Sequence, residues 1–274
     1  CTVMMFVAVA AFAQNISILP LGDSITWGCG TDGMPGGSAD CAADAGGYRV
    51  PLLWSLSQAY WPDTNAQLDV HTVGTLKTGP KKLVPASWLS HEGHPGWRID
   101  QIDDPLERNR WIAKKPDIIT VHLGTNDCGQ NYQPATMQAK MISLLNHTFE
   151  ALPDTHVFLA SILRMPNSGD MPDFSKSELH NETPWISDGV RIAKCQENFN
   201  VMVPQIVNNF AALGHKITYV PMAEATGLCA PMGDKDEGLC AGGSVHPISA
   251  GYLRMASAWS YSILQHYKLS RRIT

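Results

Sequence analysis

The stretch Ile16–Thr26, with the sequence ISILPLGDSIT, indicates how this chain folds. Its first half, Ile16–Leu21, is an apolar run typical of a buried β-strand, which we expect to stop at Gly22. Asp23 and Ser24 follow directly. In an open parallel sheet, ligands bind beyond the carboxyl ends of the strands. Polar side chains placed directly after this strand are therefore candidates for chemistry.

Apolar runs alternate with helical patterns along the rest of the 274-residue chain. Such alternation is typical of βαβ units around a parallel sheet, so the pattern predicts an α/β fold with a five-stranded parallel sheet. The other predicted strands are Leu68–Val73, Asp117–Leu123, His156–Leu163 and Lys216–Val220. The predicted helices are Tyr48–Tyr60, Ile99–Lys114, Pro134–Leu152, Pro184–Leu213 (one long helix or a broken one) and Ser249–Tyr267.

Glycine- and proline-rich stretches separate these elements and are interpreted as loops. Long loops in a compact domain are usually functional or disordered. No repeat, low-complexity segment or linker divides the sequence, so residues 14–274 are expected to form one domain. The predicted loops are Gly30–Gly47, Thr78–Pro95, Met165–Pro184 and Gly227–Pro247.

The N-terminus has the pattern of a targeting segment. Val3–Ala13 is an uninterrupted apolar run, and Ala11–Ala13 has the small-x-small form that signal peptidases cut. We interpret residues 1–13 as a truncated signal peptide, with a short buried strand as the alternative. The run is too short to span a bilayer as a helix, and no later stretch reaches the ~18 apolar residues needed. The chain is thus expected to be secreted and extracellular, without a membrane partner.

Six cysteines follow the predicted signal peptide. An even number in an oxidising compartment suggests disulfides, although six cysteines permit many pairings. We expect the near pairs Cys29/Cys41 and Cys229/Cys240. The absence of C-x-x-C argues against a zinc or redox motif. Sequons compatible with glycosylation stand at Asn15, Asn146 and Asn181.

The composition makes nucleic acid an unexpected partner. Hydrophobic residues make up 44% and charged residues 16% of the chain, the balance of a globular protein. The formal net charge is -5, and the longest basic groups are Lys81–Lys82 and Arg271–Arg272. Binding of nucleic acid needs a surface of clustered lysine and arginine, which these short pairs do not provide.

Four residues at predicted strand ends or before the last helix meet the needs of acyl transfer. That reaction requires a hydroxyl nucleophile, a base that takes its proton, and donors aimed at the developing oxyanion. Ser24 would supply the nucleophile and His246 the base. The oxyanion donors would be the N–H groups of Ser24 and Gly74 and the side-chain amide of Asn126. The simpler alternatives are a helix N-cap for Ser24, a turn for Asn126 and a loop histidine for His246.

The sequence resembles the SGNH (GDSL-like) hydrolase superfamily in four blocks that occur in the family's order. They are Gly22–Thr26 (GDSIT), Gly74 after the second strand, Gly124–Asp127 (GTND) and His246–Pro247. Four ordered motifs rarely coincide by chance. The resemblance implies a flavodoxin-like three-layer α/β/α sandwich, and a serine esterase without a bound organic cofactor.

A narrower resemblance concerns the secreted acetylxylan esterase branch, carbohydrate esterase family three. Gly46–Arg49, Val73–Thr75 and His91–Trp97 are similar to that branch. It implies removal of acetyl groups from plant cell-wall polysaccharide such as acetylxylan. We expect the protein to be a monomer whose partner is this ester substrate. The alternatives are a lipase or phospholipase on the same scaffold and a non-catalytic carbohydrate-binding relative.

One position departs from the superfamily pattern, which usually has Asp three residues before the catalytic histidine. Here that position is Gly243. Loss of the acid that orients the imidazole can cost about 10⁴ in kcat. A backbone carbonyl of residues 242–244 could orient His246 in a Ser–His dyad, or the protein could be a catalytically weak relative. We favour the dyad; a third explanation is a substitute carboxylate from Asp234, Asp236 or Glu237.

The segment His91–His94 (HEGH) is similar to a zinc-protease motif but lacks its second histidine, because proline follows. Proline and glycine also prevent the helix that such a site requires, so no metal is expected. We expect the segment to form a wall of the substrate cleft, to which His94 and Trp97 contribute. Trp97 would stack on a sugar ring or, alternatively, pack in the core. Asp23 and Asp127 are expected to hold loops through backbone amides.

Overall fold

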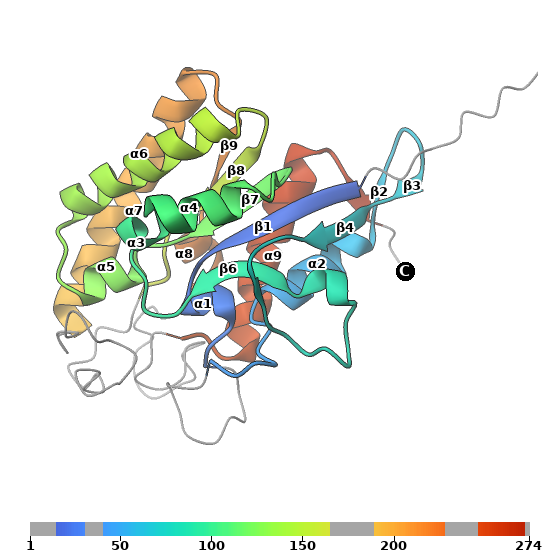
Figure 1. Cartoon of the computed structure of the whole chain (residues 1–274), viewed down its shortest axis with the longest axis horizontal. Coiled ribbons are helices and arrows are strands. Elements are labelled where there is room, and N and C mark those ends of the chain that lie inside the picture. Colours follow the sequence, from blue (N-terminus) through green and yellow to red (C-terminus); the bar gives the residue numbers. More distant parts are fainter. Residues whose placement is uncertain (1–14, 31–40, 165–188, 228–245, 272–274) are drawn as a thin grey trace, which may run out of the picture.

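A parallel sheet forms the centre of the molecule, with β1 running through its middle (Figure 1). The computed structural model describes residues 15–30, 41–164, 189–227 and 246–271. The five strands predicted from apolar runs are all present and parallel, in the order β4-β1-β7-β8-β9. Their bounds are β1 (Asn15–Asp23), β4 (Asp69–Thr72), β7 (Ile118–His122), β8 (His156–Ala160) and β9 (Ile217–Val220).

The predicted number of five strands was wrong, because the sheet of the described residues has seven. β6 (Ser90–His94) lies in the predicted loop Thr78–Pro95 and runs parallel to the second half of β1, whereas β4 pairs with the first half. The short strand β5 (Leu76–Lys77) pairs antiparallel with β6. β6 escaped the prediction because its sequence, SHEGH, has no apolar run, although its first four residues are buried.

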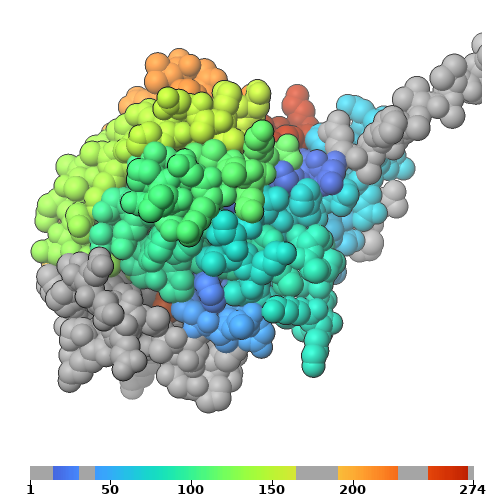
Figure 2. Space-filling model, in the orientation of Figure 1, coloured from blue at the N-terminus to red at the C-terminus, as the bar shows by residue number. Residues whose placement is uncertain are grey.

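Helices cover both faces of the sheet and give the predicted three layers. One face is covered by α2 (Arg49–Ser57) and α9 (Ser249–His266), the other by α3 (Ile99–Ile102), α4 (Pro105–Ile112), α6 (Pro134–Ala151) and α7 (Gly189–Ala212). Successive side chains of a strand point to opposite faces. Accordingly Ile16 and Ile18 pack with α2 and α9, whereas Leu19 and Leu21 pack with the other helices. In Figure 2, which shows the face that carries α4 and α6, little of the dark-blue β1 segment is visible at the surface.

The predicted helix Ile99–Lys114 is in fact two helices, α3 and α4. The second helix, α4, begins at Pro105. Proline is favourable at this first position, because an N–H there would have no acceptor within the helix. The side chain of Asp104 caps this helix by accepting the N–H of Leu106 at 2.9 Å. By contrast, α7 continues through Pro204 as one long helix. The predicted start of that helix, Pro184, lies outside the described residues.

Three short helices follow strands at the carboxyl edge of the sheet: α1 (Ser24–Trp27), α5 (Thr125–Gly129) and α8 (Met222–Thr226). At the opposite end, a small antiparallel sheet joins β10 (Ser270–Arg271), β2 (Ala59–Trp61) and β3 (Ala66–Gln67) (Figure 1). Within the described ranges, no helix combines the length and hydrophobicity that crossing a bilayer requires.

Two disulfides are present in the described part of the chain. Cys29–Cys41 confirms one predicted pair and ties the segment after α1 to the residues before α2. Cys128–Cys195 joins α5 to α7 across 67 positions of sequence. The other predicted pair, Cys229/Cys240, lies outside the described residues.

The buried side chain of Arg49, at the start of α2, joins several loops at the carboxyl edge. Its guanidinium donates to the backbone carbonyls of Thr26 and Trp27 in α1, at 2.8 and 3.1 Å. It also donates to the carbonyls of Ala45 and Thr78, at 3.1 and 3.2 Å. Burial lowers the pKa of this guanidinium to about 10, so it stays charged at neutral pH.

We expect Arg49→Met to lower the free energy of unfolding by about 2–4 kcal/mol, because several buried carbonyls lose their donors. Urea unfolding followed by circular dichroism measures this. The matched control is Arg110→Met, which removes an exposed arginine paired with Glu107 and should change the free energy by less than about 1 kcal/mol. Equal effects of the two substitutions would show that the Arg49 contacts contribute nothing.

Two histidine rings are in contact where β8 begins and α9 ends, with an interplanar angle of 45°. The ring centroids of His156 and His266 lie 3.8 Å apart, and His156 Nε2 lies 2.8 Å from the hydroxyl of Thr218. Burial, together with the neighbouring His266, lowers the pKa of His156 to about 4. The unfolded chain therefore takes up a proton at this position at a higher pH than the folded protein does.

This difference predicts acid sensitivity. Above about pH 6.5 both states are neutral at His156, and between about pH 6.5 and pH 4 the free energy of unfolding falls by at most about 1.4 kcal/mol per pH unit. Between pH 7 and pH 5, the free energy of unfolding of His156→Gln should fall by about 1 kcal/mol or more less than that of wild type, because this variant lacks the titrating imidazole. Urea titrations at both pH values measure it, with His71→Gln as control. An identical pH dependence in wild type and His156→Gln would contradict the prediction.

Candidate active site

Ser24 is the first residue of α1 and follows β1 directly. The carboxylate of Asp23 accepts the N–H of Ile25 at 2.9 Å, which caps the short helix and holds the turn, as predicted for Asp23. The turn requires glycine at position 22, because a Cβ there would lie 2.1 Å from the hydroxyl of Thr26. Ser24 is 7% exposed, so its hydroxyl sits in a defined environment at the end of the strand.

His246 lies beside Ser24, although 222 positions separate them in sequence. Its Nε2 is 2.8 Å from the Ser24 hydroxyl oxygen. The loop after α1 packs closely on the histidine, since a Cβ on Gly30 would lie 2.3 Å from the His246 Cβ. An unprotonated Nε2 at this distance accepts the serine proton, which is the contact that nucleophilic catalysis needs. Gly243 and the loop carboxylates Asp234, Asp236 and Glu237 lie outside the described residues.

Gly74 lies two residues after β4, in a backbone conformation that favours glycine. Its φ is +152°, and a Cβ would lie 2.4 Å from the carbonyl oxygen of His91. The N–H of Val73 donates to Ile18 of β1 at 2.9 Å, which holds this end of β4 against β1. Among the described residues, the N–H of Gly74 donates to no protein acceptor. A substrate oxygen can therefore be its acceptor.

Asn126 lies in α5 and is 3% exposed. Its side-chain nitrogen donates to the backbone carbonyl of Trp97 at 2.8 Å, which uses one of the two amide hydrogens and leaves the other for a ligand. The neighbouring Asp127 holds a loop, as predicted. Its carboxylate accepts a hydrogen bond from the N–H of Ile99 at 3.0 Å and forms an ion pair with Lys140 at 3.2 Å. Burial raises the pKa of this carboxylate.

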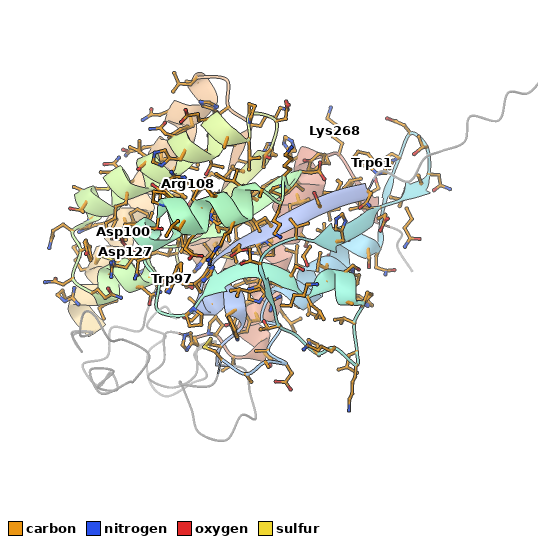
Figure 3. The ribbon with its side chains drawn as sticks, in the orientation of Figure 1. Trp61, Trp97, Asp100, Arg108, Asp127 and Lys268 are labelled. Atoms are coloured by element: carbon orange, nitrogen blue, oxygen red, sulfur yellow. A yellow bond between two sulfur atoms is a disulfide. The ribbon has the colours of Figure 1, made fainter. Side chains whose placement is uncertain are left out.

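Strand pairing places these groups at one edge of the sheet. Asp23 pairs with His94 of β6, and Gly22 pairs with His122 of β7, so the segments after β1, β6 and β7 leave the sheet together. In Figure 3, Trp97 and Asp127 lie at the end of the sheet where β1 ends, while Trp61 lies at the opposite end. Of the predicted site residues, direct hydrogen bonding joins Ser24 to His246.

His94 and Trp97, expected in the cleft wall, stack on each other with ring centroids 4.1 Å apart. Trp97 is half-buried and packs against the hydrophobic core, so one face of its ring is already occupied. The buried Glu92 accepts a hydrogen bond from His94 Nε2 at 2.9 Å and was not among the predicted site residues. No signal in the sequence identified it, because β6 lies in a predicted loop and the donors to Glu92 are known only from the fold.

The described residues contain no group of three or more His, Cys, Asp and Glu side chains placed to hold a metal. The HEGH segment is a strand rather than the helix of a zinc protease. The buried His91 has a structural role, because its ring nitrogens lie 2.8 Å from the Thr78 hydroxyl and 2.9 Å from the N–H of Gly93. Burial lowers the pKa of His91 to about 2, so it stays neutral.

Asp23 differs electrostatically from an ordinary surface carboxylate. Burial, with a smaller contribution from the charge of Asp127, raises the pKa of Asp23 to about 7. The hydrogen bond from Ile25 opposes that shift but does not cancel it. Burial likewise lowers the pKa of His122, at the end of β7, to about 4. Near neutral pH, Asp23 is therefore partly protonated and His122 is neutral.

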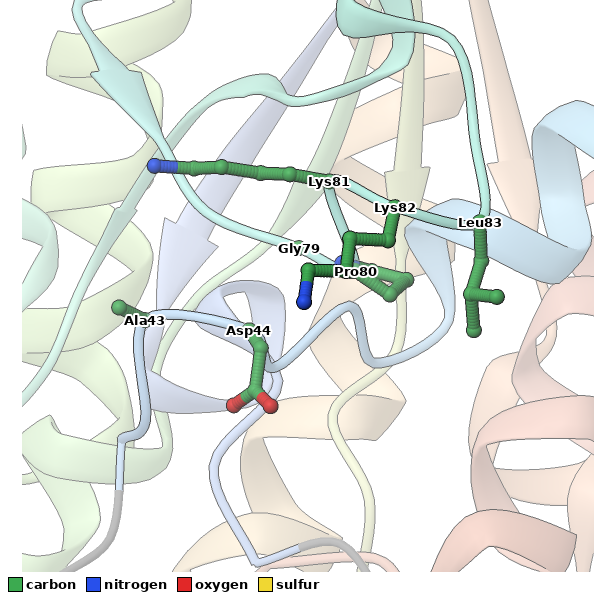
Figure 4. Close-up of a pocket in the computed structure, with 7 residues that line it drawn as sticks. All are labelled: Ala43, Asp44, Gly79, Pro80, Lys81, Lys82 and Leu83. Atoms are coloured by element: carbon green, nitrogen blue, oxygen red, sulfur yellow. The ribbon is translucent and has the colours of Figure 1, made fainter.

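A surface cavity of about 600 Å³ lies beside the segment that the Cys29–Cys41 disulfide ties to α1 (Figure 4). None of the predicted site residues lines it. Lys81 and Lys82 project from its rim, and Asp44 lies on the opposite wall. The described residues that line it are Ala43, Asp44, Gly79, Pro80, Lys81, Lys82 and Leu83.

Solved structures of esterases share this fold. A family 3 carbohydrate esterase of Clostridium thermocellum is 23% identical, with a TM-score of 0.65 over 93% of this chain and 98% of that chain. A carbohydrate esterase family 3 protein of Talaromyces cellulolyticus is 20% identical, with a TM-score of 0.61 over 92% and 98%. At these identities the likeness shows the fold, which is the predicted α/β sandwich.

Sequence comparison defines the family. A multidomain esterase of Ruminococcus flavefaciens is 25% identical over an alignment of 283 positions, which covers 94% of this chain and 30% of that relative. The chain thus spans less than a third of the relative's length. The family model described as GDSL-like Lipase/Acylhydrolase matches residues 21–254. The chain therefore belongs to the GDSL-like lipase/acylhydrolase family.

Proposed function

We propose that this chain is a secreted acetyl esterase that acts on plant cell-wall polysaccharide such as acetylxylan, with Ser24 as nucleophile and His246 as general base. The observation that carries the catalytic part is the 2.8 Å contact between the Ser24 hydroxyl and His246 Nε2. This contact lies at the carboxyl end of β1, where a parallel sheet presents its ligand site.

The reaction follows from the groups in place. Ser24 Oγ attacks the acyl carbonyl while His246 Nε2 takes the hydroxyl proton, and the same imidazolium then protonates the leaving alcohol. The N–H groups of Ser24 and Gly74 and the second amide hydrogen of Asn126 stabilise the oxyanion. His246 then activates a water molecule that releases the acid from Ser24. In this proposal, Ser24 and His246 work as a dyad, as we favoured from the sequence.

The substrate proposal is supported by the names of similar proteins. The neighbours in fold include family 3 carbohydrate esterases and an acetylxylan esterase of Geobacillus stearothermophilus, which is 16% identical with a TM-score of 0.56. The relative from Ruminococcus flavefaciens is an esterase with further domains. We further propose that residues 14–274 form one monomeric domain after removal of residues 1–13. The two disulfides are compatible with an oxidising, extracellular compartment.

Replacing Ser24 by alanine should abolish catalysis. We expect Ser24→Ala to release acetate from 4-nitrophenyl acetate at least about 10³-fold more slowly than wild type, because no other group forms the acyl-enzyme. Ser257→Ala, which removes an exposed hydroxyl on α9, is the matched control and should retain full activity. Equal rates from wild type and Ser24→Ala would overturn the serine mechanism and leave the non-catalytic alternative.

The acyl group distinguishes the two enzyme classes. We expect kcat/KM for 4-nitrophenyl acetate to exceed that for the corresponding octanoate and palmitate esters. We also expect acetylated xylan to release acetate with the wild-type protein but not with Ser24→Ala. Each additional buried methylene is worth about 0.8 kcal/mol to an enzyme with an apolar acyl cleft. A kcat/KM that rises with chain length would instead identify a lipase or phospholipase.

A further inference from the structure

Glu92 is a buried carboxylate that receives three donors. It is 2% exposed and lies in β6, paired with Leu21 of β1. The backbone N–H and the hydroxyl of Thr75 both donate to it, the hydroxyl at 2.9 Å to Oε2. His94 Nε2 lies 2.9 Å from the same oxygen. Because a carboxylate only accepts hydrogen bonds, Nε2 must carry the proton of that imidazole.

The first two donors fix the backbone beside Gly74. The N–H of Thr75 belongs to the peptide group that directly follows Gly74 and is held by Glu92. On the other side, the N–H of Val73 is held by Ile18. Gly74 is a flexible residue at φ +152°, so anchoring both flanking residues is what directs its own N–H.

The third donor connects Glu92 to Asn126. With Nε2 held by Glu92, the His94 ring stacks on Trp97 with an interplanar angle of 17°. The N–H of Trp97 donates to the carbonyl of His94 at 3.2 Å, and the Trp97 carbonyl accepts the Asn126 amide at 2.8 Å. One carboxylate therefore connects, through short contacts, both donors that lie outside the serine turn.

We propose that Glu92 is a positioning residue of the oxyanion hole, which holds the Gly74 N–H and the Asn126 amide in one fixed geometry. This inference rests on the proposed function of those two groups. Glu92 touches neither Ser24 nor His246 in these contacts, so its effect belongs to the transition state, in which the oxyanion forms, more than to substrate binding.

The test is Glu92→Gln, which keeps the size of the side chain but replaces one acceptor oxygen by a donor group that Thr75 and His94 cannot bond in the same way. We expect kcat on 4-nitrophenyl acetate to fall about 10-fold or more, with KM changed by less than about 3-fold. Asn126→Ala should lower kcat by about 10². The double variant should be less impaired than the product of the two single effects, because both act on the same oxyanion contacts.

The matched control is Asp103→Asn. Asp103 is also a largely buried carboxylate with three donors, from Arg108, Ser143 and His147, but it lies between α3 and α4. This variant should retain the kcat of wild type. A thermal unfolding transition verifies that each variant is folded. If Glu92→Gln does not fold, Thr75→Val replaces it, because this exposed residue loses only the hydroxyl donor and should still lower kcat several-fold.

The inference is overturned if folded Glu92→Gln keeps the kcat of wild type, if its effect multiplies fully with that of Asn126→Ala, or if Asp103→Asn is equally impaired. When Thr75→Val is used, an unchanged kcat overturns it. Ser24→Ala in the same assay separates this failure from failure of the proposed function. An inactive Ser24→Ala beside a fully active Glu92→Gln rejects only the role of Glu92, whereas an active Ser24→Ala rejects the serine mechanism itself.

Discussion

The guanidinium of Arg49 is the interaction on which the loops around the candidate site depend. Parallel strands satisfy their own backbone groups, but the segments that leave the sheet carry buried carbonyls that need other donors. Arg49 supplies them for the segments at Thr26–Trp27, Ala45 and Thr78, which strand pairing does not connect. Its hydrogen bonds go to neutral oxygens, so the carbonyl dipoles themselves stabilise the buried charge. Arg49 thereby attaches α1, the short helix that begins with Ser24, to neighbouring loops.

Three buried carboxylates hold the backbone beside the groups proposed for catalysis, each in the same way. A carboxylate accepts the backbone N–H of a residue in another segment or one turn further on, and so fixes the chain next to a group proposed for catalysis. Burial makes this arrangement unfavourable for an isolated charge, which is why the pKa values of Asp23 and Asp127 are raised. The three cases are Asp23 with Ile25 beside Ser24, Glu92 with Thr75 beside Gly74, and Asp127 with Ile99 beside Asn126.

Hydrophobic pattern predicted the strands that are apolar and missed the one that is polar. Ile16–Leu21, β7 and β8 are buried on both faces, and β4 and β9 are partly buried. Such runs are visible in sequence because apolar burial requires apolar residues. β6 is buried too, but its SHEGH residues are stabilised by hydrogen bonds with partners such as Thr75 and Thr78. Those partners are known only after folding. The split at Pro105 had a local signal, since proline favours a helix start, yet the apolar pattern of Ile99–Lys114 continued through it.

The sequence by itself determined the parallel α/β order, the polar residues after β1 and β7, and the family to which the chain belongs, because these depend on local pattern and on motif order. Only the tertiary structure decided that His246 lies 2.8 Å from Ser24, that Cys128 pairs with Cys195, and that Glu92 connects two further parts of the site. Such contacts join residues far apart in sequence. Their geometry is set by how strands and helices pack, and no short stretch of residues contains that information.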